Sequence, residues 1–131
     1  MKKLIFLLII SINFAAFSSP NWGKTGHRTV GEIATNYLQK STFKKINNLL
    51  DNASIAAVSV YADDIRSDEK YDQYASWHYV NFIGNKKYKE DAINPEGDIL
   101  QGMKSCILNI RSETTTKEEK TFALKMLIHF V

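Results

Sequence analysis

The sequence predicts an all-α domain, because apolar residues recur at helical spacing and capping residues precede several of these runs. The chain has 131 residues, which suits one domain or a piece of one. Apolar residues make up 44% of the chain and charged residues 24%, and this balance excludes collagen-like, low-complexity and globally disordered classes. A chain of this composition can build a hydrophobic core.

Three helices are predicted in the first half of the chain. The first covers residues 27–39, and its apolar stripe consists of Val30, Ile33, Ala34, Tyr37 and Leu38. Ser41 is the expected N-cap of the second helix. A third helix is expected to begin after Ser54 and to continue to Ile65, and the charged segment 67–72 is expected to be a loop.

Two further helices are predicted in the second half. Asn94 and Pro95 fit the N-cap and the first helical position of one of them. Thr116 and Glu119 have the spacing of a capping box, which opens the last helix. That helix reaches the end of the sequence without a stop signal, so we expect the chain to be truncated. The segment 77–83 alternates poorly and receives no assignment.

Residues 1–21 are predicted to be a signal peptide. Lys2 and Lys3 precede an apolar run at 4–17 with small residues at its end, which is the order of a secretory leader. The run is short for a membrane span, and an uncleaved N-terminal anchor is the alternative. We therefore expect the mature protein to be exported, periplasmic or secreted, and free of the membrane after cleavage.

Charge and cysteine content limit the remaining classes. Outside Lys2 and Lys3, 15 basic residues face 14 acidic ones, so net charge gives no argument for nucleic-acid binding. Cys106 is the single cysteine, and no disulfide can form within the chain. We expect Cys106 to be a small buried side chain, and bound metal is one candidate for stabilising the fold.

Three histidines and one aspartate carry the candidate chemistry. His27, His78 and His129 supply imidazole nitrogens and Asp63 a carboxylate, which are the usual ligands of zinc in hydrolytic sites. Each has an ordinary explanation when taken alone. His129 on an apolar helical face is typical of a packed side chain, and Asp63 close to Arg66 is typical of a solvated surface pair. None of the histidines falls in a charged surface stretch, which favours a functional role.

Four short motifs, taken together, resemble the S1/P1 nuclease family. They are Trp-Gly-Lys-Thr-Gly-His at 22–27, Tyr-Ala-Asp-Asp-Ile-Arg at 61–66, Trp-His-Tyr-Val-Asn at 77–81 and Leu-Ile-His-Phe-Val at 127–131. The resemblance implies a multi-helix orthogonal bundle of the zinc phospholipase C / P1 nuclease type, truncated at its C-terminus, with residues 22–131 as the N-terminal part of the domain. It also implies an exported enzyme with three Zn²⁺ ions in a cleft.

The resemblance implies roles for single residues. Trp22 corresponds to the N-terminal residue of the mature family members, whose free amine and carbonyl oxygen bind one zinc together with His27. Asp63, His78 and His129 correspond to ligands of a second zinc, and Asp63 also to the group that orients a metal-bound water. The remaining ligands of the three-zinc cluster are expected beyond the end of this sequence.

The site of leader cleavage decides whether Trp22 can bind zinc in this way. Cleavage before Trp22 frees its amine but puts Asn21 at the last leader position, where a small residue is expected. Cleavage after Ser18 suits the small-residue rule and leaves Trp22 internal. Both positions stay open.

Three further residues correspond to the family's substrate contacts. Arg66 matches an arginine that stabilises negative charge on the phosphate, Tyr79 an aromatic ring that stacks on a base, and Asn81 a group that hydrogen-bonds the base edge. The implied reaction is hydrolysis of single-stranded DNA and RNA, and of nucleotide 3′-phosphates, by metal-activated water, with 5′-phosphate products. This piece alone is expected to be inactive, and no protein partner is predicted.

Two alternatives remain open. A zinc-dependent phospholipase C resembles the same fold and metal cluster, and it would differ at the substrate pocket. An exported, non-enzymatic helical module would use the histidines only structurally, and its stability would not depend on metal.

Overall fold

The computed structural model describes residues 23–81, 84, 86–88 and 94–131. All regular elements in these ranges are helices, so the prediction of an all-α fold is confirmed. In chain order they are the α-helices α2 (Lys24–Tyr37), α3 (Lys40–Leu49), α4 (Ile55–Val58) and α5 (Tyr61–Ile65), the 3₁₀-helix η1 (Glu69–His78), and the α-helices α6 (Ile99–Arg111) and α7 (Lys117–Phe130).

Two predicted capping positions agree with the structure. The Ser54 hydroxyl accepts a hydrogen bond from the Ala57 amide at 3.1 Å and begins α4. At the start of α7, the Thr116 hydroxyl accepts from the Glu119 amide at 3.2 Å, and the Glu119 carboxylate accepts from the Thr116 amide at 2.9 Å. Such caps each stabilise a helix by about 1 kcal/mol, because they satisfy amides that have no partner within the helix.

Two other predicted caps are wrong. The backbone is extended at Gln39, so α3 begins one residue later, and Ser41 lies inside its first turn. Asn94 and Pro95 belong to a turn in which the Gly97 amide donates to the Asn94 carbonyl at 2.9 Å. Gly97 has a positive φ of 91°, which interrupts any helix started there, and α6 begins after Asp98 instead.

The central segment also differs from the prediction. The single helix expected after Ser54 is two short helices, α4 and α5, separated at Ser59 and Val60. The predicted loop at 67–72 is wrong for most of its length, because η1 starts at Glu69 and continues to His78. The Asp68 carboxylate caps η1 by accepting from the Lys70 amide at 3.3 Å.

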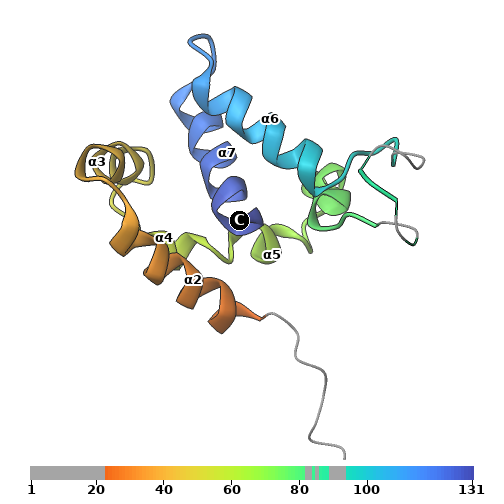
Figure 1. Ribbon diagram of the computed structural model, residues 1–131. Coiled ribbons are helices and arrows are strands. Elements are labelled where there is room, and N and C mark those ends of the chain that lie inside the picture. The colour runs from red at the N-terminus through yellow and green to blue at the C-terminus, as the bar shows by residue number, and fades with distance from the viewer. Residues whose placement is uncertain (1–22, 82–83, 85, 89–93) are drawn as a thin grey trace, which may run out of the picture.

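Helix α7 lies in the middle of the fold and is packed antiparallel against α6 (Figure 1). Two hydrophobic clusters meet on it. The first consists of Leu50, Ile55, Val58 and Leu124, and the second of Ala62, Cys106, Ala123 and Met126. Because α7 contributes to both, its last turn is held beside α5. Burial of the cluster side chains supplies the main stabilisation of this arrangement.

Cys106 lies in the second cluster, as its small apolar character predicted. Only 2% of its surface is exposed, and it forms no disulfide. Burial raises the pKa of its thiol to about 11, because the charged thiolate would lose its hydration. Cys106 is therefore a packing residue.

Two close approaches of the backbone need glycine. Gly31 brings α2 against α4, where a Cβ atom would lie 3.0 Å from the Ala56 Cα atom. Gly102 brings α6 against the indole ring of Trp77, and a Cβ atom would lie 2.7–2.9 Å from three ring atoms. The first contact determines where α2 sits, and the second supports η1, which ends at His78.

Replacing Gly102 by alanine tests the second contact. An added methyl group would overlap the Trp77 ring, so we expect Gly102→Ala to lower the free energy of unfolding by about 1–3 kcal/mol. The higher helix propensity of alanine, taken alone, would raise the free energy of unfolding by about 1 kcal/mol. Urea denaturation measures the change, with Lys104→Ala on the exposed side of the same helix as control. Equal or higher stability of Gly102→Ala would contradict the tight contact.

Candidate metal centre

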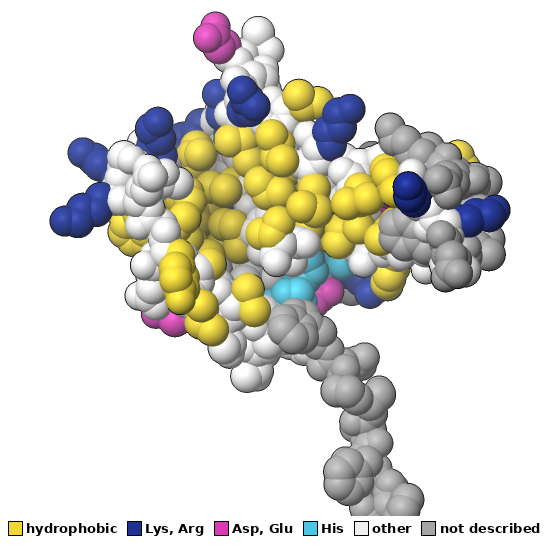
Figure 2. All heavy atoms as spheres, in the orientation of Figure 1, with side chains coloured by type: hydrophobic (Ala, Val, Ile, Leu, Met, Phe, Trp, Pro, Cys, Tyr) yellow, Lys and Arg dark blue, Asp and Glu magenta, His cyan; other side chains and the backbone are white. Residues whose placement is uncertain are grey.

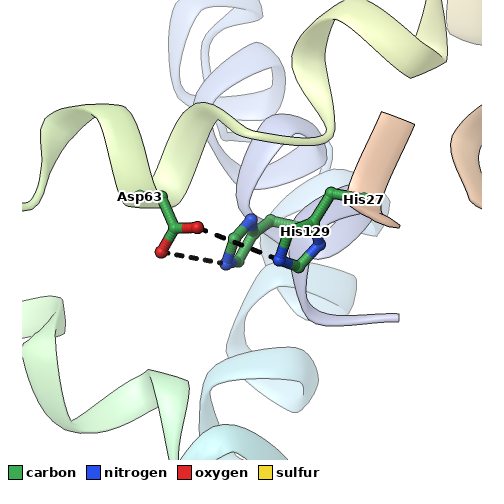
Figure 3. Close-up of side chains that lie close together, drawn as sticks. All are labelled: His27, Asp63 and His129. Carbon is green, nitrogen blue, oxygen red and sulfur yellow. Dashed lines mark ion pairs between the residues drawn. The ribbon is translucent and has the colours of Figure 1, made fainter. Parts of the chain in front are cut away.

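The three histidines and Asp63 lie on four separate elements that meet at one place. His27 is in the first turns of α2, Asp63 in α5, His78 at the end of η1 and His129 in the last turn of α7. Figure 3 shows the Asp63 carboxylate pointing toward the rings of His27 and His129. On the face shown in Figure 2, histidine side chains reach the surface beside an acidic side chain. The fold therefore brings together four residues that are far apart in the sequence.

The distances within this group suit a shared cation better than direct hydrogen bonds. Asp63 Oδ1 lies 3.8 Å from His78 Nε2 and 3.7 Å from His129 Nε2, and Asp63 Oδ2 lies 3.8 Å from His27 Nε2. These separations are too long for hydrogen bonds. Two ligand atoms at bonding distance from one tetrahedral zinc lie about 3.3–3.5 Å apart, which is close to the observed spacing.

Backbone carbonyls orient two of the rings. The Nδ1–H group of His129 donates to the Ser59 carbonyl at 2.8 Å, and that of His78 donates to the Ala75 carbonyl at 3.3 Å. A ring whose Nδ1 carries the proton has a lone pair on Nε2 when it is neutral. Both Nε2 atoms therefore offer lone pairs toward Asp63, and this is the usual support for a metal-binding histidine.

The Nε2 atom of His78 provides the test of whether these residues fit a metal ion. It is buried and has no hydrogen-bond partner among the described residues. A buried polar atom without a partner is costly, because it has lost its hydration and gained nothing in return. A cation between His78 and the Asp63 carboxylate would remove this cost, so the donor set fits a metal ion.

His27 is adapted to the neutral state. Its ring stacks on that of His129, with centroids 4.2 Å apart and an interplanar angle of 24°. Burial lowers the pKa of His27 most, the neighbouring His129 lowers it further, and the Asp63 carboxylate partly offsets both effects. A neutral imidazole can donate its lone pair to a metal ion, whereas an imidazolium cannot.

The two oxygens of Asp63 face different imidazoles. Oδ1 faces His78 and His129, and Oδ2 faces His27. The ligand atoms of His27, Asp63 and His129 all lie within 4.8 Å of one another. A carboxylate in this position can bridge two cations, one on each side. Trp22, the predicted partner of His27, lies outside the described residues.

A cavity of about 730 Å³ opens over this group. Besides the four residues above, Arg66 and Tyr79 line it. Arg66 caps the C-terminal end of α5, and its guanidinium donates a hydrogen bond to the Tyr79 hydroxyl and lies 5.4 Å from the centre of that ring. Asn81 is exposed and is not among the described residues that line this cavity. Arg66 and Tyr79 are thus next to the candidate metal ligands, and Asn81 is more remote.

Sequence reasoning missed several groups that build the site. The Ser59 and Ala75 carbonyls belong to the backbone, and no residue type signals their role. The ammonium group of Lys24 forms a 2.6 Å ion pair with Asp64, and the sequence patterns assign no role to either residue. These two residues are 40 positions apart, so the pair has no local signature.

A cavity lined by imidazoles and a carboxylate on converging helices defines a helical protein with a candidate hydrolytic metal centre. Residues 22–131 match the family model described as S1/P1 Nuclease. The chain belongs to the S1/P1 nuclease family.

Curated relatives bear related names. The chain is 26% identical over 125 residues to Endonuclease 4 of Arabidopsis thaliana, a match that covers 84% of this chain and 42% of that protein. It is 23% identical over 119 residues to Nuclease P1 of Penicillium citrinum and to Nuclease PA3 of a Penicillium species, covering 84% of this chain and 44% of each relative. No solved structure matches the chain. The chain spans less than half the length of these relatives. Its membership of the family supports a nuclease function.

The lowered pKa of His27 predicts how the metal-free protein responds to acid. The unfolded chain protonates His27 near pH 6.5, and the folded protein does so only at lower pH. The unfolded state therefore binds more protons in this window, so this contribution to stability is complete above pH 6.5 and is lost as the pH falls toward the folded-state pKa. We expect wild-type protein to lose stability more steeply than His27→Gln between about pH 7 and pH 5. Parallel curves from urea denaturation would contradict this expectation.

Proposed function

We propose that the protein is a zinc-dependent phosphodiesterase, an endonuclease and 3′-nucleotidase that hydrolyses single-stranded DNA and RNA to 5′-phosphate products. The observation that carries the proposal is the group of three imidazoles around the Asp63 carboxylate, with a buried Nε2 atom on His78 that has no hydrogen-bond partner. Membership of the S1/P1 nuclease family supports the reaction class. Because the chain covers 42–44% of its relatives, the proposal concerns the whole protein.

Zinc is the metal that this donor set favours. Three imidazole nitrogens and one carboxylate suit zinc, whereas magnesium and calcium prefer oxygen ligands alone. Zinc would be held by His27, Asp63, His78 and His129. The amine and the carbonyl oxygen of Trp22 would complete the ligands near His27. Bound zinc would lower the pKa of a coordinated water to near neutrality and polarise the phosphate.

The chain's own residues have two tasks in the reaction. Asp63 accepts a hydrogen bond from the attacking water and thereby directs it at phosphorus, a role that its partly exposed carboxylate allows. Arg66 lies one helical turn after Asp63 and lines the same cavity. Its guanidinium offers a rigid fork of donors to the phosphate oxygens, on which negative charge accumulates as the bond to the leaving oxygen breaks.

Tyr79 and Asn81 are proposed to bind the base. Tyr79 lines the cavity and has 48% of its surface exposed, so one face of its ring is accessible for stacking. Stacking accepts every base, which suits a nuclease of broad specificity. A base within a duplex would have to leave its own stack first, so single strands are the better substrate. Asn81 would contact the base edge from its exposed position beyond Tyr79.

Residues 1–21 are proposed to be a signal peptide that directs the protein to the periplasm or to secretion. In the described part of the chain, no helix combines the length and apolarity of a membrane span. Gly23, which directly follows Trp22, lines the cavity, and this supports a role for the mature terminus in the metal site.

N-terminal sequencing of the exported protein tests this role. Cleavage before Trp22 would free its amine for a zinc ion, because an α-amine loses its proton readily beside a cation. We expect a mature chain that begins Trp-Gly-Lys. A mature chain that begins at Ser19 would leave Trp22 without a free amine and would contradict this part of the proposal.

Zinc titration tests the proposed ligands. We expect zinc to raise the melting temperature of the purified chain, because an ion that binds only the folded state stabilises it. The described donors, with Trp22, serve two ions at most, so we expect residues 22–131 alone to bind zinc weakly and to lack nuclease activity. Asp63→Asn should weaken zinc binding at least about tenfold, whereas the exposed Asp72→Asn should not change it. Equal affinities for the two variants would contradict the assignment of Asp63.

Activity of the whole protein separates the proposed function from its alternatives. Release of 5′-nucleotides from single-stranded DNA supports the nuclease. Release of phosphocholine from phosphatidylcholine, without cleavage of DNA, would instead identify a phospholipase C. A melting temperature unchanged by chelators would identify a non-enzymatic module, because its histidines would then serve packing alone.

A further inference from the structure

We propose that the exposed ion pair between Lys24 and Asp64 positions helix α2 so that His27 faces the Asp63 carboxylate. Lys24 Nζ lies 2.6 Å from Asp64 Oδ1, and this contact joins the first residue of α2 to α5. The inference rests on the proposed metal centre, since it assigns a positioning role toward one of that centre's ligands.

The positions on α2 support this role. Lys24, His27 and Gly31 are spaced by three and four residues, so they lie along one face of the helix. On α5, Asp63 and Asp64 are adjacent. Asp64 binds Lys24, and Asp63 faces His27. The ion pair therefore lies one helical turn before the ligand whose position it would control.

Among the described residues, helix α2 is otherwise held by its packing against α4 and by the stacking of His27 on His129. Gly31 is its single buried residue, and it contacts α4 near Ala56. His27 comes one turn before this contact, toward the N-terminal end of the helix. Without the pair of Lys24 and Asp64, the first turns of α2 could pivot about Gly31. A pivot of this kind would move the His27 ring relative to Asp63.

The pair contributes little to global stability. Lys24 and Asp64 keep 62% and 46% of their side-chain surface exposed, and water screens such pairs strongly. A metal site is more sensitive to small displacements, because groups that orient its ligands change affinity about 10- to 100-fold. Loss of an exposed ion pair should therefore lower metal affinity by about tenfold or less.

The test compares zinc affinity among surface variants of the whole protein, measured by competition with a chromogenic chelator. We expect Lys24→Gln and Asp64→Asn each to weaken zinc binding about three- to tenfold, and the double variant to weaken it no more than either one. The exchanged pair, Lys24→Asp with Asp64→Lys, should recover most of the affinity. Melting temperatures of the metal-free proteins should stay within about 2 °C of wild type.

Lys117 and Asp51 provide a matched control. Their side chains form an exposed ion pair of 2.7 Å that also joins distant parts of the chain, away from the cavity. Lys117→Gln and Asp51→Asn should leave zinc affinity unchanged. Nuclear Overhauser contacts between the His27 and His129 rings should weaken in the metal-free Asp64→Asn variant and not in Asp51→Asn, if the His27 ring is displaced.

The outcomes separate this inference from the proposed function. If wild-type protein binds no zinc, the metal centre itself is wrong, and the inference falls with it. If wild-type protein binds zinc and the Lys24 and Asp64 variants bind it equally well, the positioning role alone is overturned. A loss of substrate affinity in Lys24→Gln, with zinc affinity and the His27 ring unchanged, would also overturn it, because Lys24 would then contact the phosphate.

Discussion

The central feature of the structure is the close approach of three imidazole rings to the carboxylate of Asp63. The Nε2 atoms of His27, His78 and His129 lie 3.7–3.8 Å from its oxygens, beyond hydrogen-bonding distance. The Nε2 lone pairs of His78 and His129 and the carboxylate repel one another unless a cation lies between them. The fold holds this arrangement in place for the cation that it is proposed to bind.

Helix α7 and the interruption between α4 and α5 make this arrangement. The buried side chains of α7 anchor it in both hydrophobic clusters, which places His129 beside α5. Because the helix is interrupted after Val58, the Ser59 carbonyl is available to accept the Nδ1–H group of His129 at 2.8 Å. After the interruption, α5 begins at Tyr61 and carries Asp63, whose carboxylate faces the histidines. A local irregularity of the backbone thus contributes to the site.

The all-helical class and several helix starts could be predicted from the sequence, but the detailed geometry of the site could not. Periodicity and the caps at Ser54 and Thr116 predicted helices correctly, because these signals are local. The interruption at Ser59 and the 3₁₀-helix before His78 depend on tertiary packing, which overrides propensity. The motifs indicated the candidate ligand residues. They could not predict the carbonyls that orient two of these residues, nor the ion pair of Lys24 with Asp64 across 40 positions.

Anomalous diffraction at the zinc absorption edge, from crystals of zinc-loaded protein, shows directly whether a zinc ion lies at Asp63. We predict an anomalous peak between the carboxylate oxygens of Asp63 and the Nε2 atoms that face them, at about 2.0–2.2 Å from its ligand atoms. A zinc-loaded crystal with no peak at Asp63, or with its peak at the Cys106 thiolate, would contradict the proposed metal centre.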